Sequence, residues 1–202
     1  MRARAARMRQ TVAGLATVVL LGAGEAAADG MLSDFAYPYP VKSYALSSQG
    51  QSLTMAYMDV AARGTPNGRT VVLFHGKNFC GATWEGVIGS LAGAGYRVVV
   101  PDQIGFCKST KPVTYQMSFH QLAANTHALL ESLGVSRPIL IGHSMGGMLA
   151  TRYALSFPKA TAALVLVNPI GLEDWSAKGV PGRTVDELLE AERKTEAARI
   201  KA

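Results

Sequence analysis

The chain has 202 residues, of which 49% are hydrophobic, and its formal net charge is +6. This composition is ordinary for one globular α/β domain and excludes a largely disordered chain. Four of the basic residues, Arg2, Arg4, Arg7 and Arg9, fall in the first ten positions. An export signal explains such an opening better than a nucleic-acid partner does, so we expect no nucleic-acid binding.

The first 28 residues have the three parts of a secretory signal peptide. A basic start is followed by an apolar run from Thr11 to Gly24 and by small residues at positions 26–28. A membrane anchor is the alternative, but this run is shorter than the roughly 20 residues that span a bilayer. We therefore predict cleavage after Ala28, no stable membrane anchor, and a periplasmic or secreted mature protein.

Cys80 and Cys107 are the only cysteines in the sequence. In an oxidising compartment they can pair, although two buried free thiols explain the pattern equally well. Each cysteine comes just after one of two strands that we expect to be parallel neighbours, so the two should lie close together. A bond requires Cα atoms within about 7 Å of each other.

The predicted elements begin with a hairpin. Alternating residues favour strands over 41–47 and 53–59, with a turn at 49–51. Residues 63–68 are rich in turn formers, and residues 70–74 form an apolar run typical of a buried strand.

From there strands and helices alternate along the chain. A helix ending near Gly95 is predicted to bury a face made of Trp84, Val87, Ile88 and Leu91. Ser118 with Gln121 resembles a capping box. The later strands are predicted at 96–100, 138–141 and 162–167, and the helices at 119–133 and 145–156. This order predicts an α/β protein with a mostly parallel sheet and helices on both faces.

The composition changes after Asn168. Residues 175–182 are loop-like, and Thr184 with Glu187 caps a charged helix whose short apolar face needs a partner surface. We therefore divide the chain into a core at 29–172 and the start of a cap or lid at 173–202.

The strongest chemical signal is the G-x-S-x-G motif at 142–146, placed between an apolar strand and a helix. Its glycines permit a sharp turn that lifts the hydroxyl of Ser144 off the sheet. The following helix points its first amides at developing negative charge. Ser144 is therefore the predicted nucleophile.

A second signal is the strand that ends in His75 and Gly76, as an oxyanion loop requires. Acyl transfer builds charge on a carbonyl oxygen, which two fixed backbone amides can hold. The candidates are the amides of Lys77 and Met145. His75 is expected to bond to neighbouring backbone rather than act directly in catalysis. The residues expected to shape the substrate site are His75, Gly76, Asn78 and Phe106.

Residues 102–109 follow the fourth strand, at the sheet edge where open α/β folds bind ligands. Together, these three segments resemble the α/β-hydrolase superfamily, in its serine-dependent esterase and lipase branch, over Val41 to Glu173. The resemblance implies an α/β-hydrolase fold lacking its last strands, a small-molecule substrate, and no metal or organic cofactor. We expect the substrate to be a carboxylic ester, but carbon–carbon bond hydrolysis and cofactor-free perhydrolysis use the same set of residues, so the substrate stays open. A serine at position 144 argues against dehalogenases and epoxide hydrolases, which carry aspartate there.

The sequence departs from that family in its histidines. The family order is Ser, acid, His, but His75, His120, His127 and His143 all precede Ser144. We therefore expect the catalytic histidine to be absent from this chain, which alone should be poorly active and should leave the edge of strand 162–167 unpaired. The alternative function is a ligand-binding protein without catalysis, built on the same fold.

Overall fold

The computed structural model describes residues 32 and 34–194. The predicted signal peptide, residues 1–28, lies outside them. The strands are β1 (Val41–Ser48), β2 (Gln51–Val60), β3 (Thr70–Phe74), β4 (Arg97–Pro101), β5 (Ile139–His143) and β6 (Ala163–Val167). The helices are α1 (Glu85–Gly93), α2 (Phe119–Ser132), α3 (Met145–Ser156) and α4 (Val185–Arg193), with short 3-10 helices η3 (Gly81–Trp84) and η4 (Pro158–Ala160).

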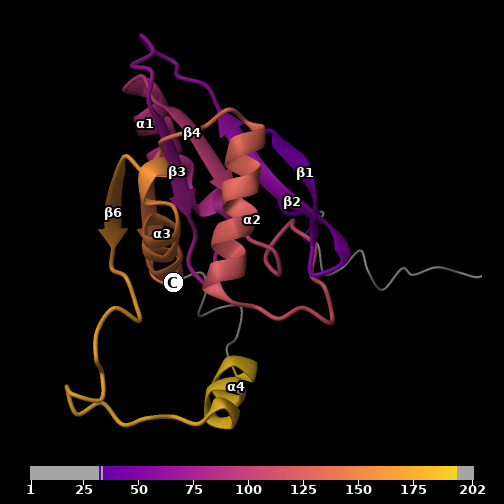
Figure 1. Cartoon of the computed structure of the whole chain (residues 1–202), viewed down its shortest axis with the longest axis vertical. Helices are drawn as coiled ribbons and strands as arrows, with labels where there is room; N and C mark the ends of the chain where they lie inside the picture. The colour runs from indigo at the N-terminus through magenta and orange to yellow at the C-terminus, as the bar shows by residue number, and fades with distance from the viewer. Residues whose placement is uncertain (1–31, 33, 195–202) are drawn as a thin grey trace, which may run out of the picture.

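The six strands form one mixed sheet in the order β1-β2-β4-β3-β5-β6 (Figure 1). The β1–β2 and β2–β4 pairs are antiparallel, and the β4–β3, β3–β5 and β5–β6 pairs are parallel. The mostly parallel sheet predicted from the sequence is confirmed. The carboxyl ends of β3, β4 and β5 therefore meet at one edge, where the candidate site forms.

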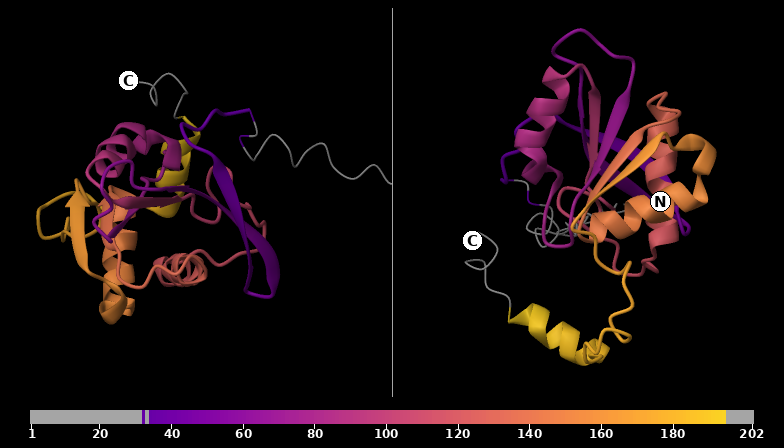
Figure 2. Two further views of the ribbon diagram at one scale, coloured as in Figure 1. Left: turned by 90° about the horizontal axis from the view of Figure 1, so that it is seen from above. Right: turned by 90° about the vertical axis from the view of Figure 1, so that its left-hand side faces the viewer.

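Helices cover both faces of the sheet, with α1 on one side and α2 and α3 on the other (Figure 2). Strand residues alternate between the two cores accordingly. Val72, Phe74 and Leu140 belong to the core that includes residues of α2 and α3, whereas Val71 and Leu73 belong to the core that includes Ile88 and Ala92 of α1. Such alternation places a strand's two apolar sets on opposite faces.

Local signals placed most elements within one or two residues. The hairpin turns at Gln49 and Gly50, both with positive φ, as a two-residue turn between twisted strands requires. Ser118 caps α2 by accepting a hydrogen bond from the Gln121 amide at 3.1 Å. The prediction that Val87 lies on a buried face was wrong. Its side chain is 38% exposed, because α1 turns Ile88 and Ala92 toward the sheet instead.

Strand β6 lies at the sheet edge, and all five of its residues are exposed. Among the described residues only β5 pairs with it. Helix α4 lies apart from the sheet and its helices (Figure 1). It begins as predicted, with the Glu187 carboxylate accepting from the Thr184 amide at 2.7 Å and Thr184 Oγ1 accepting from the Glu187 amide at 3.2 Å.

Candidate active site

Ser144 sits in a strained turn between β5 and α3. Its φ of 54° and ψ of −119° are rare for a residue with a side chain. Such a conformation costs about 1–3 kcal/mol and persists only where the surrounding structure holds it in place. Backbone hydrogen bonds hold it here. The Ser144 amide donates to the Val167 carbonyl at 3.1 Å, and the Ser144 carbonyl accepts from the amides of Gly147 at 2.9 Å and Ile170 at 3.3 Å.

The flanking glycines are required because backbone fills the space where their side chains would stand. A Cβ on Gly142 would lie 2.2 Å from the Gly146 carbonyl oxygen. A Cβ on Gly146 would lie 2.2 Å from the carbonyl oxygen of Phe74, at the end of β3. Real Cβ atoms do not come this close to backbone oxygens. The turn can therefore fold this tightly and pack against the end of β3 only because residues 142 and 146 are glycine.

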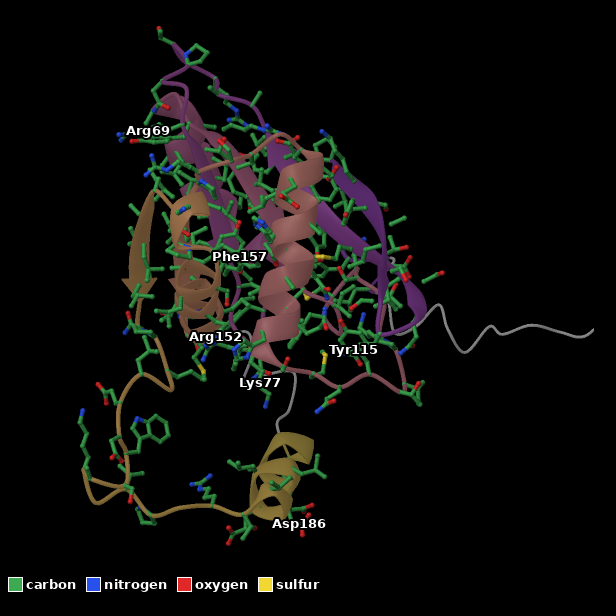
Figure 3. The ribbon with its side chains drawn as sticks, viewed as in Figure 1. Arg69, Lys77, Tyr115, Arg152, Phe157 and Asp186 are labelled. Atoms are coloured by element: carbon green, nitrogen blue, oxygen red, sulfur yellow. A yellow bond between two sulfur atoms is a disulfide. The ribbon has the colours of Figure 1, made fainter. Side chains whose placement is uncertain are left out.

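The loop after β3 runs beside the serine. A Cβ built on Gly76 would lie 3.4 Å from the Cβ of Ser144. The loop turns at once, since the Phe79 amide donates to the Gly76 carbonyl at 3.2 Å. Lys77 and Asn78, inside this turn, are exposed. Arg69 precedes β3 in the chain and Lys77 follows it, and Figure 3 shows the two side chains at opposite ends of the sheet.

Met145 opens α3, so its amide is one of the first-turn amides that lack an acceptor within the helix. Lys77 follows Gly76 in the loop beside Ser144, and Met145 follows Ser144 directly, so the two predicted oxyanion residues come from two different segments.

His75 lies behind the site rather than in it. Its side chain is 1% exposed, its Nδ1 donates to the Gly76 carbonyl at 2.8 Å, and its Nε2 accepts from the Gln103 amide at 3.1 Å. Burial lowers the pKa of His75, although the Gly76 carbonyl and the charge of Asp102 act in the opposite direction. A neutral ring matches these two bonds, since one nitrogen donates and the other accepts.

Aromatic side chains pack against His143 and His75, the residues just before Ser144 and Gly76. The Phe79 ring, 37% exposed, meets the His143 ring edge-on at 5.8 Å, and Trp84 meets His143 from another direction at 6.4 Å. Phe106 is half-buried against His75 at 5.4 Å. Aromatic side chains therefore lie next to the turn that carries Ser144.

Asp102 is a buried carboxylate whose role the sequence did not reveal. It follows β4 directly, is 1% exposed, and accepts from the Gly81 amide at 2.8 Å and the Lys108 amide at 3.1 Å. The hydroxyl of Tyr37 also donates to it, and this bond together with burial raises the pKa of Tyr37. The only sequence signal was an aspartate directly after a buried strand. Two of its three partners, Gly81 and Tyr37, lie 21 and 65 residues away and could not be found from the local sequence.

Cys80 and Cys107 form a disulfide with a Cα separation of 5.7 Å. The prediction that they lie close together is confirmed, and the pairing left open by the sequence is decided in favour of the bond. The bond ties the loop after β3 to the loop after β4.

Two of the four histidines are bonded to groups other than Ser144. His75 is engaged at both nitrogens, and His127 bonds to the Tyr153 hydroxyl at 2.9 Å and stacks on Phe157. Within the described part of the chain, the Ser144 hydroxyl has no hydrogen-bond partner.

Two cavities lie away from Ser144. One of about 490 Å³ is lined by Asp59, Arg69 and Arg97 among others, and one of about 500 Å³ lies within residues 175–188.

The described residues contain no group of three or more histidines, cysteines or acidic residues that could hold a metal ion. No helix in the described ranges is long and apolar enough to cross a membrane.

A family model described as alpha/beta hydrolase fold matches residues 69–196, more than half of the chain. The chain belongs to this family.

Individual relatives agree with this assignment. A probable hydrolytic enzyme from Pseudomonas aeruginosa PAO1 is 61% identical with a TM-score of 0.79, over 85% of this chain and 55% of that one. A 2-hydroxy-6-oxo-6-phenylhexa-2,4-dienoate hydrolase from Burkholderia cepacia is 29% identical, over 63% of this chain and 49% of its own length. Lipase 1 of Psychrobacter immobilis is 33% identical, over 65% and 41%. The chain spans about half the length of the curated relatives it matches.

Proposed function

We propose that this chain belongs to an exported serine hydrolase that acts on small carboxylic esters. The observation that carries the proposal is the strained Ser144 turn, held between two glycines that admit no side chain and set beside the Gly76 loop. The two curated relatives described above are named a 2-hydroxy-6-oxo-6-phenylhexa-2,4-dienoate hydrolase and a lipase, which supports a carbonyl substrate.

In the proposed reaction, Ser144 Oγ attacks the ester carbonyl carbon while its proton passes to a general base. The carbonyl oxygen becomes negative and accepts hydrogen bonds from the Lys77 and Met145 amides. The alcohol then leaves with that proton, and water hydrolyses the acyl-serine by the same route in reverse. The base in this proposal is a histidine that follows Ser144 in the full-length protein, because His75 and His127 are engaged elsewhere.

Export is also proposed. The Cys80–Cys107 disulfide supports an oxidising compartment, since such bonds persist outside the cytosol and are rare within it. A mature N-terminus at Asp29 in protein recovered from periplasm or medium supports it, and an intact Met1 form recovered there contradicts it.

The alternative is a protein that binds ligands on this fold without turning them over. The lone hydroxyl of Ser144 favours it, because a serine without a base is a weak nucleophile. The two proposals differ in whether Ser144 reacts.

The test is hydrolysis of a short-chain aryl ester, together with labelling by a fluorophosphonate probe and location of the label by mass spectrometry. We expect little turnover from the purified chain alone. We expect rates typical of enzymes when the chain is extended by the sequence that follows the matched region in the Pseudomonas aeruginosa relative. Ser144→Ala should abolish both rate and label in the extended protein, whereas Ser156→Ala, at the exposed end of the same helix, should change neither.

If the extended protein binds the ester but neither turns it over nor labels at Ser144, the binding-protein alternative is correct. If the unextended chain turns over rapidly in a Ser144-dependent way, one of its own histidines is the base.

A further inference from the structure

The loop that carries the Lys77 amide is held at both ends by one dipeptide, Asp102–Gln103. At its start, His75 Nε2 accepts from the Gln103 amide at 3.1 Å. At its end, the Gly81 amide donates to Asp102 Oδ1 at 2.8 Å. The intervening residues turn tightly, so the position of Lys77 depends on these two anchors.

Asp102 is itself fixed from all sides. Its amide donates to the Ala56 carbonyl at 2.9 Å, and its carbonyl accepts from Ser109 Oγ at 2.7 Å. Ser109 Oγ also accepts from the Ala56 amide at 2.9 Å. The backbone of Asp102 is thus attached to β2, directly and through Ser109. Its carboxylate can transmit that rigidity to a loop that lacks regular structure of its own.

The carboxylate joins two loops at once. Oδ1 binds Gly81 in the loop after β3, and Oδ2 binds Lys108 in the loop after β4. The residues just before these two, Cys80 and Cys107, form the disulfide. A covalent link and a charged hydrogen-bond link therefore bridge the same two loops at neighbouring positions.

We propose that Asp102 is the positioning residue of the oxyanion loop, holding the Lys77 amide beside Ser144 in concert with the adjacent Cys80–Cys107 disulfide. Asp102 does not touch the substrate and takes no part in proton transfer. Its three acceptor bonds are charge-assisted, which makes them stronger and more directional than bonds between neutral groups. The effect of Asp102 on catalysis rests on the proposed serine hydrolase function. Its effect on the position of the loop does not depend on that function.

The first test is amide hydrogen exchange on the purified chain. Asp102→Ala should lower protection at least about tenfold in residues 76–81 and 105–109, while α2 and α3 keep theirs. Asp102→Asn should behave differently at its two ends, because an amide keeps one acceptor for Gly81 but turns a donor toward the Lys108 N–H. We expect protection to be restored at Gly81 and lost at Lys108.

Asp59 supplies the matched control. It is also a largely buried carboxylate, but its partners are Lys42 and Arg97 at the opposite end of the sheet. Asp59→Ala should leave exchange in residues 76–81 unchanged. The double substitution Cys80→Ser/Cys107→Ser should also lower exchange protection in the two loops. Added to Asp102→Ala, it should lower protection by a larger factor than the product of the two separate factors.

The second test is kinetic and uses the extended protein described above. Asp102→Ala should lower kcat roughly 100-fold with KM little changed, because a displaced oxyanion amide weakens binding of the transition state rather than of the ester. The proposal is overturned if Asp102→Ala leaves exchange in residues 76–81 unchanged, or if it loosens α2 and α3 equally. If no form turns over, the hydrolase proposal fails while the exchange result still decides the role of Asp102.

Discussion

At the scale of single residues, Ser144 keeps its conformation because nearby positions carry no side chain. Glycine at 142 and 146 lets backbone approach to distances that any Cβ would prevent. The sequence motif predicted a turn there. The structure adds the reason for the second glycine, which is the carbonyl oxygen of Phe74 at the end of β3.

We expect Gly146→Ala to destabilise the protein by at least about 2 kcal/mol, because its methyl group would lie 2.2 Å from a backbone oxygen. Gly89→Ala is the matched control. Its methyl group would meet only the Tyr39 hydroxyl at 3.7 Å, and alanine favours the helix, so stability should rise by about 0.5–1 kcal/mol. Urea unfolding measures both. Equal effects from the two substitutions would contradict the steric argument.

His75 should make stability depend on pH below neutrality. Burial lowers its pKa in the folded state from the ordinary 6.5, so the unfolded chain binds a proton that the folded chain does not. The stabilisation is complete above pH 6.5 and is lost as the pH falls below it, with a slope of no more than about 1.4 kcal/mol per pH unit.

Unfolding free energies measured between pH 7.5 and 5 check this, with His75→Gln as the comparison. The variant should have the flatter profile over this range. The pKa of Asp59 is also shifted. Burial raises it, but the hydrogen bonds and charges of Arg97 and Lys42 lower it by more. Asp59 therefore titrates below this pH range and does not contribute to the measured slope. An unchanged slope in His75→Gln would assign the dependence to another group.

At the scale of elements, the loops after β3 and β4 are held by bonds to each other rather than by regular structure. The disulfide closes 27 residues of chain, including α1 and β4. A loop of this length restricts the unfolded chain, which stabilises the folded state by about 3 kcal/mol in the chain-entropy model.

We therefore expect Cys80→Ser/Cys107→Ser to lower stability by about 3 kcal/mol, or the Tm by roughly 6 to 12 °C. Calorimetry of the variant beside the wild type, each with and without reductant, checks this. Reductant should lower the Tm of the wild type to that of the variant and leave the variant unchanged. A wild-type Tm insensitive to reductant under conditions that expose two free thiols would refute the prediction.

At the scale of the whole molecule, the sheet ends in an apolar edge. Val165 and Val167 pair with Ile141 and His143, so they face the side of the sheet that carries α1, and they are 43% and 37% exposed. Exposed strands with free edge groups and apolar side chains pair with other chains. The purified chain should therefore self-associate as its concentration rises.

Val165→Lys should reduce that self-association by placing a charge on the open face of β6. Val87→Lys is the control, since Val87 has similar exposure but lies on helix α1 rather than on an edge strand. Sedimentation velocity over a range of concentrations distinguishes them. Self-association unchanged by Val165→Lys, or reduced equally by both variants, would exclude β6 as the contact.

The sequence by itself determined the local features of this protein. Periodicity, caps and turn residues predicted the strands, the helices and the Ser144 turn, because each depends on residues a few positions apart. Val87 was misplaced because periodicity defines a helix face only to within about one residue, and the sheet selects which side is buried.

The tertiary structure alone decided which distant residues meet. It showed that Cys80 and Cys107 bond, that Tyr37 and Gly81 converge on Asp102, and that His75 lies behind the site. These contacts join segments tens of residues apart, and their partners are set by strand order and register. No local pattern encodes that order, because it depends on how the whole sheet buries its two faces.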